Sequence, residues 1–322
     1  MIIWKTYHAE IKALMDKNLS SSAIAVVLAK LHQNENLNKP RQIRRQMAII
    51  RDGETPKEIM KPATSARILV FDIETAPFKS FVWSFWKQNV GQNQVISDWF
   101  CLTWAAKWLF EEEVMSDKLT EDEVLNEDDE RIVRSFWKLL DEADIVIAHN
   151  ANGFDIPKLN TKFLQYGLHP PSPYEVIDTL LHLRKKFKFG SNRLNYVNAV
   201  LGLDVKQDTG GFELWSTCME GNVASLEKME KYNVQDVKIL EDLYLKMRSW
   251  IQPHPNIGLH VDEDIKACPS CGHHHLEPCG TYNTYANSYA ALRCTNCGSI
   301  SRERRNNVSK QKKQNLVIST PR

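Results

Sequence analysis

Two carboxylates stand two residues apart inside the apolar stretch ILVFDIET, residues 68–75. The apolar residues around Asp72 and Glu74 predict a strand, and side chains two residues apart on a strand point to the same face. Burying such a pair without partners is costly. Asp-x-Glu also occurs at residues 52–54 and 128–130, but polar neighbours there predict solvated acids. Only Asp72 and Glu74 stand in a context that calls for a cation or another partner.

Two further acids lie where folding can bring them to this pair. Asp155 follows the predicted strand 144–148 and begins a helix, where the helix dipole favours a carboxylate. Asp236 lies on a predicted helix, roughly 223–248, and Tyr232 precedes it by one turn on the same face. Taken singly, these residues are a helix cap, a solvated acid and a packed aromatic.

Four carboxylates brought together predict a site for divalent cations. Without cations their mutual repulsion makes such a cluster untenable, and oxygen ligands favour hard ions such as Mg²⁺ or Mn²⁺. Two such ions about 4 Å apart stabilise both the attacking and the leaving oxygen in phosphodiester cleavage.

Three motifs that contain these residues, FDIET, NANGFD and YNVQD, resemble in their order the DEDD (DnaQ-like) superfamily of 3′→5′ exonucleases. Tyr232 resembles the tyrosine branch (DEDDy); the histidine branch has His five residues before the last Asp, where this chain has Lys231. Residues 82–109, 177–189 and 210–215 are similar to uncharacterised exonuclease-like proteins of bacteriophages. The resemblance spans roughly residues 66–250 and continues into the cysteine-rich region.

The resemblance implies an RNase H-like fold and a set of site residues. Four carboxylates would hold two Mg²⁺ or Mn²⁺ ions, and Glu74 would also contact the terminal sugar or the water. Tyr232 would orient the water that attacks the terminal phosphodiester. Asn150 and Phe154 complete the second motif and are expected at the substrate, where Phe154 packs rather than reacts. The implied metal ligands are Asp72, Glu74, Asp155 and Asp236.

A segment rich in cations and aromatics, residues 184–193 (RKKFKFGSNR), suits a path for single-stranded nucleic acid. Its candidate substrate contacts are Lys185, Lys186 and Arg193. The alternative is an exposed amphipathic segment. Asp178, in VIDTLL, either supports the site from behind its ligands or serves as a structural cap or turn residue.

Two Cys-x-x-Cys pairs, each followed by Gly, predict a structural Zn²⁺ site near the C-terminus. Each pair supplies two thiolates from one tight turn, so two pairs complete a tetrahedral Cys₄ site. Cys279 and residues 273–275 (HHH) offer competing ligands, but the paired spacing is sufficient by itself. The region resembles a zinc ribbon, including those on transposase-like phage proteins. The predicted zinc ligands are Cys268, Cys271, Cys294 and Cys297.

The elements that position these residues predict an α/β protein, with an RNase H-like mixed sheet flanked by helices. A small helical domain precedes it. This domain resembles a helix-turn-helix whose last helix carries Arg41, Arg44 and Arg45; these arginines either contact DNA or are merely exposed. The expected divisions are 1–51 (helical domain), 52–66 (linker), 67–250 (exonuclease domain), 251–266 (linker), 267–305 (zinc ribbon) and 306–322 (basic disordered tail).

Charge is segregated along the 322 residues although the net charge is only +1. Residues 1–51 hold nine Lys and Arg against three acids, and residues 298–322 hold seven against one. Basic ends favour an anionic partner such as nucleic acid, with solvated tails as the alternative. No signal peptide and no long apolar run is visible, which predicts a cytoplasmic protein without membrane partners, in the host cytoplasm if phage-encoded.

The sequence thus predicts a 3′→5′ exonuclease acting on DNA, single-stranded or at frayed 3′ ends, in phage DNA replication, repair or processing. A polymerase or another replication protein would act from a separate chain. One alternative is an RNase or a structure-selective endonuclease on the same fold. The other is a nucleic-acid-binding regulatory protein with an inactive nuclease domain, although all five catalytic positions are filled.

Overall fold

The computed structural model divides the chain into two compact units. The N-terminal unit combines residues 1–61 with 191–205, and the main unit combines residues 62–190 with 206–322. Arg41, Arg44, Arg45 and most of the predicted linker 52–66 lie outside the described residues. The structure describes residues 4–17, 19–39, 43, 46, 47, 50, 64–205, 210–261 and 265–320.

The N-terminal unit is built from short helices around a small apolar core. Ser20 caps the second helix by accepting a hydrogen bond from the Ala23 amide at 3.3 Å. Ile11, Ile24 and Leu28 are fully buried in this core. Its elements are η1 (Trp4–Tyr7), α1 (His8–Met15), α2 (Ser21–Leu31), η2 (Glu35–Leu37) and α8 (Leu194–Leu201).

A five-stranded mixed sheet forms the centre of the main unit, in the order β5-β4-β1-β6-β7. The central strand β1 is antiparallel to β4 and parallel to β6. Beyond them, β5 pairs antiparallel with β4 and β7 pairs parallel with β6. The mixed α/β architecture expected from the sequence is confirmed. The strands are β1 (Ile68–Thr75), β4 (Cys101–Trp108), β5 (Met115–Lys118), β6 (Ile145–Ala148) and β7 (Glu175–Asp178).

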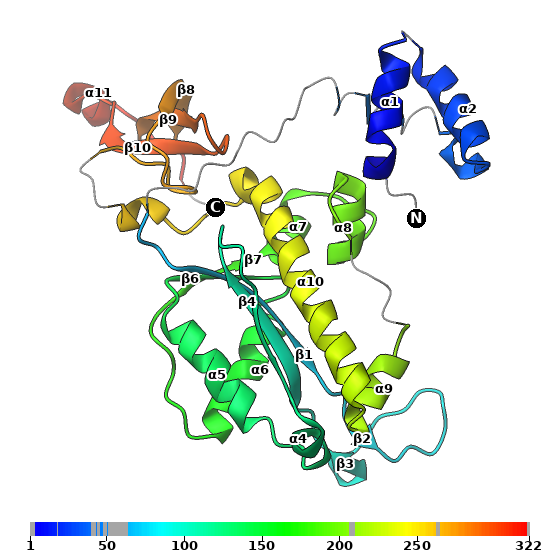
Figure 1. Cartoon of the computed structure of the whole chain (residues 1–322). Coiled ribbons are helices and arrows are strands. Elements are labelled where there is room, and N and C mark those ends of the chain that lie inside the picture. Colours follow the sequence, from blue (N-terminus) through cyan, green and yellow to red (C-terminus); the bar gives the residue numbers. More distant parts are fainter. Residues whose placement is uncertain are drawn as a thin grey trace. The chain divides into compact units, whose positions relative to one another are not determined.

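Helices cover both faces of this sheet, with α10 along one face and α5 and α6 on the other (Figure 1). The alternation of β1 fits this arrangement, because Phe71 is fully buried and its ring lies 5.2 Å from that of Phe136 on α5. Asp72 and Glu74 therefore point to the opposite face, toward α10. The helices are α4 (Glu121–Leu125), α5 (Glu130–Asp141), α6 (Asp155–Gln165), α7 (Thr179–Lys186), α9 (Glu213–Met219) and α10 (Val223–Met247).

Ion pairs with the two antiparallel strands fix α10 on the sheet. The Glu241 carboxylate pairs with Lys107 of β4 and accepts the Phe110 amide at 2.9 Å. About three turns earlier, Glu230 pairs with Lys118 of β5 at 2.5 Å. Asp236 lies between Glu230 and Glu241 on α10, so the two ion pairs together fix its position relative to the strands.

Among the residues that the structure describes, no helix is long and apolar enough to cross a membrane. Shorter elements complete the main unit. They are β2 (Lys79–Ser80), η3 (Gln92–Gln94), β3 (Val95–Ser97), η4 (Arg248–Trp250) and η5 (Ile257–His260).

The cysteine-rich region forms an antiparallel sheet in the order β10-β9-β8. The segment after it, expected to be disordered, contains a short helix capped by Ser309, whose hydroxyl accepts the Lys312 amide at 3.1 Å. These elements are β8 (Leu276–Asn283), β9 (Ser288–Cys294), β10 (Ile300–Asn306) and α11 (Lys310–Gln314).

Candidate active site

Three of the predicted carboxylates meet between β1 and α10. Asp72, Glu74 and Asp236 each offer an oxygen, and these oxygens lie within 4.8 Å of one another. Asp72 and Glu74 are half-buried, whereas Asp236 is only 1 % exposed. Three acids so close repel one another unless a cation or protons compensate their charge. The donors are all carboxylate oxygens, so the set fits a hard divalent ion such as Mg²⁺ or Mn²⁺.

Asp155 lies at the first residue of α6 and is 1 % exposed, outside that group of three. Burial, together with the negative charge of Asp178, raises the pKa of its carboxyl to about 7. A hydrogen bond with the backbone amide of Ile73 lowers the pKa. The Asp155 carboxylate therefore lies beside β1 at residue 73, which stands between Asp72 and Glu74 in the sequence. Its Oδ1 is buried and has no hydrogen-bond partner among the described residues. A cation held here would satisfy that oxygen and favour the ionised form.

Tyr232 lies on α10 one turn before Asp236, as the spacing predicts. Its half-buried ring packs edge-on against Trp215 of α9, with ring centroids 6.3 Å apart. This contact is one of the packing interactions that orient the ring. Trp215 was not among the predicted site residues.

Asp178 hydrogen-bonds the backbone of the loop that contains the second motif. This carboxylate is 2 % exposed and accepts the amides of Asn150 and Asn152, each at 3.1 Å. It also caps α7 by accepting the Leu181 amide at 3.2 Å. Asp178 is therefore the cap of α7, as one interpretation of the sequence held, and it also hydrogen-bonds the loop that contains Asn150.

Asn150 itself adopts a left-handed backbone conformation, with φ of 84°. Its side chain folds back over the loop toward Gly153. A Cβ added at Gly153 would lie 2.7 Å from the Asn150 Oδ1. A side chain at position 153 would therefore require the Asn150 side chain to move.

A cavity of about 570 Å³ opens beside Glu74. Sequence reasoning anticipated Phe154 here but missed Trp99 and Lys158. The Lys158 ammonium lies 3.7 Å from the centre of the Trp99 ring, and burial lowers its pKa. No local pattern marks these two residues, since Trp99 precedes a strand and Lys158 lies on an ordinary amphipathic helix. The cavity is lined by Glu74, Thr75, Ala76, Pro77, Phe78, Trp99, Phe154, Lys158, Gly211, Phe212 and Trp215.

The predicted basic contacts lie elsewhere in the described structure. Lys185 and Lys186 are exposed on the last turn of α7, where the Lys186 ammonium donates to Gln252 Oε1 at 3.0 Å. Arg193 is exposed and belongs to the N-terminal unit. None of the three lines the cavity beside Glu74.

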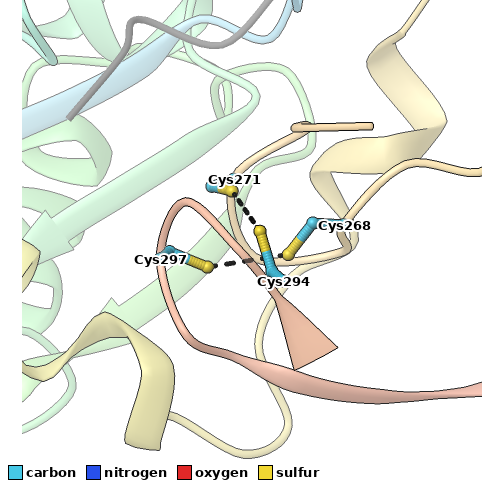
Figure 2. Close-up of side chains that lie close together, drawn as sticks. All are labelled: Cys268, Cys271, Cys294 and Cys297. Carbon is cyan, nitrogen blue, oxygen red and sulfur yellow. Dashed lines mark hydrogen bonds between the residues drawn. The ribbon is translucent and has the colours of Figure 1, made fainter. Parts of the chain in front are cut away.

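The four predicted zinc ligands converge at the base of the small sheet (Figure 2). The Sγ atoms of Cys268 and Cys297 are 3.7 Å apart, and those of Cys271 and Cys294 are 3.6 Å apart. Four sulfurs at 2.3 Å from a tetrahedral Zn²⁺ would be about 3.8 Å apart, so the spacing fits this ion. Cys279 is exposed and lies outside the set.

The thiols also influence one another's ionisation. Hydrogen bonding from Cys268 lowers the pKa of both Cys294 and Cys271, the latter to about 7. Sharing of protons within the cluster raises the pKa of Cys268 itself. All four can be thiolates together only when a cation compensates their charge. Cys101 and Cys218 are buried elsewhere, as expected for apolar cysteines.

Comparison with known proteins identifies the class to which this fold belongs. The model of the RNase_H superfamily matches residues 69–248, more than half of the chain, and the chain therefore belongs to this superfamily. The RNase H-like fold expected from the sequence is confirmed, and it supports a nuclease that uses divalent metal ions.

Among solved structures, the family B DNA polymerase from the hyperthermophilic archaeon Pyrobaculum calidifontis is similar over 61 % of this chain, with 18 % identity and a TM-score of 0.43. The similar region covers 26 % of the length of that polymerase. A search of curated proteins finds no significant match.

Proposed function

We propose that this protein is a metal-dependent 3′→5′ exonuclease of the DEDDy type that releases nucleotides from DNA 3′ ends. The proposal rests mainly on the cluster of three carboxylates formed by Asp72, Glu74 and Asp236. Their oxygens lie within 4.8 Å of one another, between β1 of the RNase H-like sheet and α10. The resemblance of the three sequence motifs supports the exonuclease class and the polarity. Phage DNA replication, repair or processing is the setting that the same resemblance suggests.

The residues that would hold two Mg²⁺ or Mn²⁺ ions are Asp72, Glu74, Asp155 and Asp236. Divalent cations at such a site lower the pKa of water and compensate charge that develops on the phosphate. Asp72 and Glu74 on β1 are half-buried, whereas Asp236 on α10 is buried, so solvent reaches the cluster from the β1 side.

Tyr232 would orient the attacking water through its hydroxyl. Its ring packs edge-on against Trp215, and its position one turn before Asp236 puts both side chains on one face of α10. A fixed donor and acceptor orders the water before attack, which lowers the entropic part of the barrier. The phenol does not have to ionise for this role.

The cavity beside Glu74 would receive the terminal nucleotide. Phe154 and Trp99 offer aromatic surface for a base or sugar, and Lys158 offers a cation for a phosphate. Glu74 borders both this cavity and the carboxylate group, so it would contact the terminal sugar while its other oxygen faces the metal site.

The activity is tested by incubating the full chain with 5′-labelled single-stranded DNA, duplex DNA and RNA, with and without added Mg²⁺ or Mn²⁺. A ladder that shortens from the 3′ end of DNA is expected. Internal cuts would instead indicate an endonuclease, preferred cleavage of RNA would indicate an RNase, and binding without any metal-dependent product would indicate a regulatory protein.

Asp72→Asn and Asp236→Asn should each lower the cleavage rate by about 10²- to 10³-fold, because several kcal/mol of transition-state stabilisation are lost. Asp242→Asn, at an exposed acid on the same helix, is the matched control and should keep the full rate. Mg²⁺ should raise the melting temperature of the zinc-loaded wild type but not of the two site variants. Full activity in both site variants would refute the assignment.

A further inference from the structure

The loop between β2 and β3 exposes four aromatic side chains within six residues. Figure 1 draws it in cyan, projecting beyond these two strands. Phe81, Trp83, Phe85 and Trp86 are 73 %, 95 %, 96 % and 83 % exposed. Aromatic side chains bury 150–250 Å² each when they pack, so a cluster of this size in solvent indicates a surface that binds something. Residues 81–86 are called the aromatic loop below.

The backbone of the aromatic loop is closed by its own hydrogen bonds. The Phe81 amide donates to the Gln94 carbonyl at 2.9 Å, and Gln94 Nε2 donates back to the Phe81 carbonyl at 3.1 Å. At the tip, Gln88 Nε2 donates to the Trp86 carbonyl at 2.8 Å. The side chains of Gln88 and Gln94 thus hydrogen-bond the backbone of this segment, and the hydrogen bonds named here do not use the aromatic side chains.

The aromatic loop follows closely in the sequence after residues 74–78, which line the cavity beside Glu74. Three residues separate Glu74 from Phe78, which also lines the cavity and is 57 % exposed. The segment 75–97 contains no acidic residue and two lysines, of which Lys79 pairs with Glu127 at 3.8 Å and Lys87 is exposed. A chain that leaves the cavity along this segment would therefore meet aromatic surface and positive charge together.

We propose that the aromatic loop binds unpaired bases of the DNA strand whose 3′ end occupies the cavity; this inference rests on the proposed nuclease function. Every base has a π-face, so stacking on exposed aromatic rings is tolerant of sequence and is worth about 1–3 kcal/mol per base. The lysines and the lack of acids suit a phosphate backbone rather than a neutral apolar partner. On duplex DNA, the loop would also stabilise bases that fray from the end.

The test uses a full-length variant with Phe81→Ser, Trp83→Ser, Phe85→Ser and Trp86→Ser. Binding of a fluorescent 20-nucleotide single strand is measured by anisotropy without added Mg²⁺ or Mn²⁺, so that no cleavage occurs. Loss of two stacked bases should raise Kd by at least about 30-fold. With Mg²⁺, kcat/KM on the 20-nucleotide strand should fall similarly, whereas kcat/KM on a dinucleotide, too short to reach the loop, should stay within about twofold.

Leu164→Ser is the matched control, because Leu164 is 81 % exposed on α6 and does not line the cavity. It should leave both binding and cleavage unchanged, and neither variant should lower the melting temperature. Unchanged binding in the loop variant overturns the inference, even if the variant sediments differently and so reveals a protein interface. Equal loss of activity on both substrates also overturns it. If the wild type cleaves nothing, the proposed function fails, and the anisotropy measurement still decides the inference.

Discussion

Asp72 and Glu74 differ from ordinary surface acids because their strand is buried on its other face. Phe71 and Ile73 are committed to the core, and alternation along β1 then leaves both carboxylates on the α10 side. Asp236 completes the group from that side. The pair is tolerable because cations can compensate its charge, and the repulsion within the group favours binding them.

At the residue scale, Tyr232→Phe removes the hydroxyl but keeps the ring, so it distinguishes the role of the hydroxyl in cleavage from the packing of the ring. The phenylalanine ring should keep the contact with Trp215, so stability should change little. Loss of one positioned hydrogen bond should lower kcat by about 10- to 100-fold. Steady-state cleavage of single-stranded DNA measures this loss, and the shift of melting temperature with Mg²⁺ should remain that of the wild type. An unchanged kcat would remove Tyr232 from the reaction.

At the scale of elements, the position of α10 on the sheet decides whether Asp236 reaches β1. The Lys107–Glu241 pair is the most buried attachment, with side chains 10 % and 11 % exposed. Glu241→Ala would leave the Lys107 ammonium buried without its partner and should lower the free energy of unfolding by about 3–5 kcal/mol. Urea unfolding followed by circular dichroism measures the change.

Glu230→Ala is the internal comparison for that prediction. The Lys118–Glu230 pair is more exposed, at 31 % and 22 %, so solvent screens it and its loss should cost only about 1 kcal/mol. If the two variants lose equal stability, the burial of the Lys107–Glu241 pair does not control how α10 is held.

His254, after the end of α10, predicts a pH dependence of stability. Its Nε2 lies 3.0 Å from the Tyr244 hydroxyl, and burial lowers the pKa of the imidazole to about 4. Between about pH 6.5 and pH 4 the unfolded chain binds a proton that the folded chain does not, so the free energy of unfolding falls as the pH drops, by about 3 kcal/mol. His254→Asn should flatten this part of the pH profile, while His169→Asn, at an exposed histidine, should not.

At the scale of the whole molecule, the Cys₄ group lies beside a small sheet of β8, β9 and β10 that has little apolar core of its own. Cys268, Cys271 and Cys294 are its buried centre, and the strands around them have mostly exposed or half-buried side chains. So small an apolar core requires another source of folding energy, which Zn²⁺ binding supplies in structural sites.

Cys271→Ser should therefore abolish binding of the one Zn²⁺ expected per chain and unfold this sheet. Zinc content by elemental analysis tests the first effect. Hydrogen exchange tests the second, with amides of residues 276–306 losing protection while those of β1 keep it. Cys279→Ser, at the exposed cysteine outside the group, should bind zinc normally. A zinc-free wild type with a protected sheet would contradict the prediction.

Sequence alone determined the features that depend on local geometry. A strand repeats every two residues, so ILVFDIET already places Asp72 and Glu74 on one face, and a helix repeats every 3.6, so Tyr232 and Asp236 must share a side. The paired cysteine motifs are equally self-sufficient, because each turn presents two thiolates. The mixed α/β character follows from the same periodicities.

Only the tertiary structure decided which of these pieces meet. The approach of Asp236 to β1 depends on ion pairs between residues more than a hundred positions apart, and the burial of Asp155 depends on the packing of α6 beside β1. The cavity of Trp99 and Lys158 and the support of the Asn150 loop by Asp178 likewise join distant segments. Local periodicity fixes the direction of a side chain on its own element, whereas its neighbours across elements are set by long-range packing that no single stretch of sequence encodes.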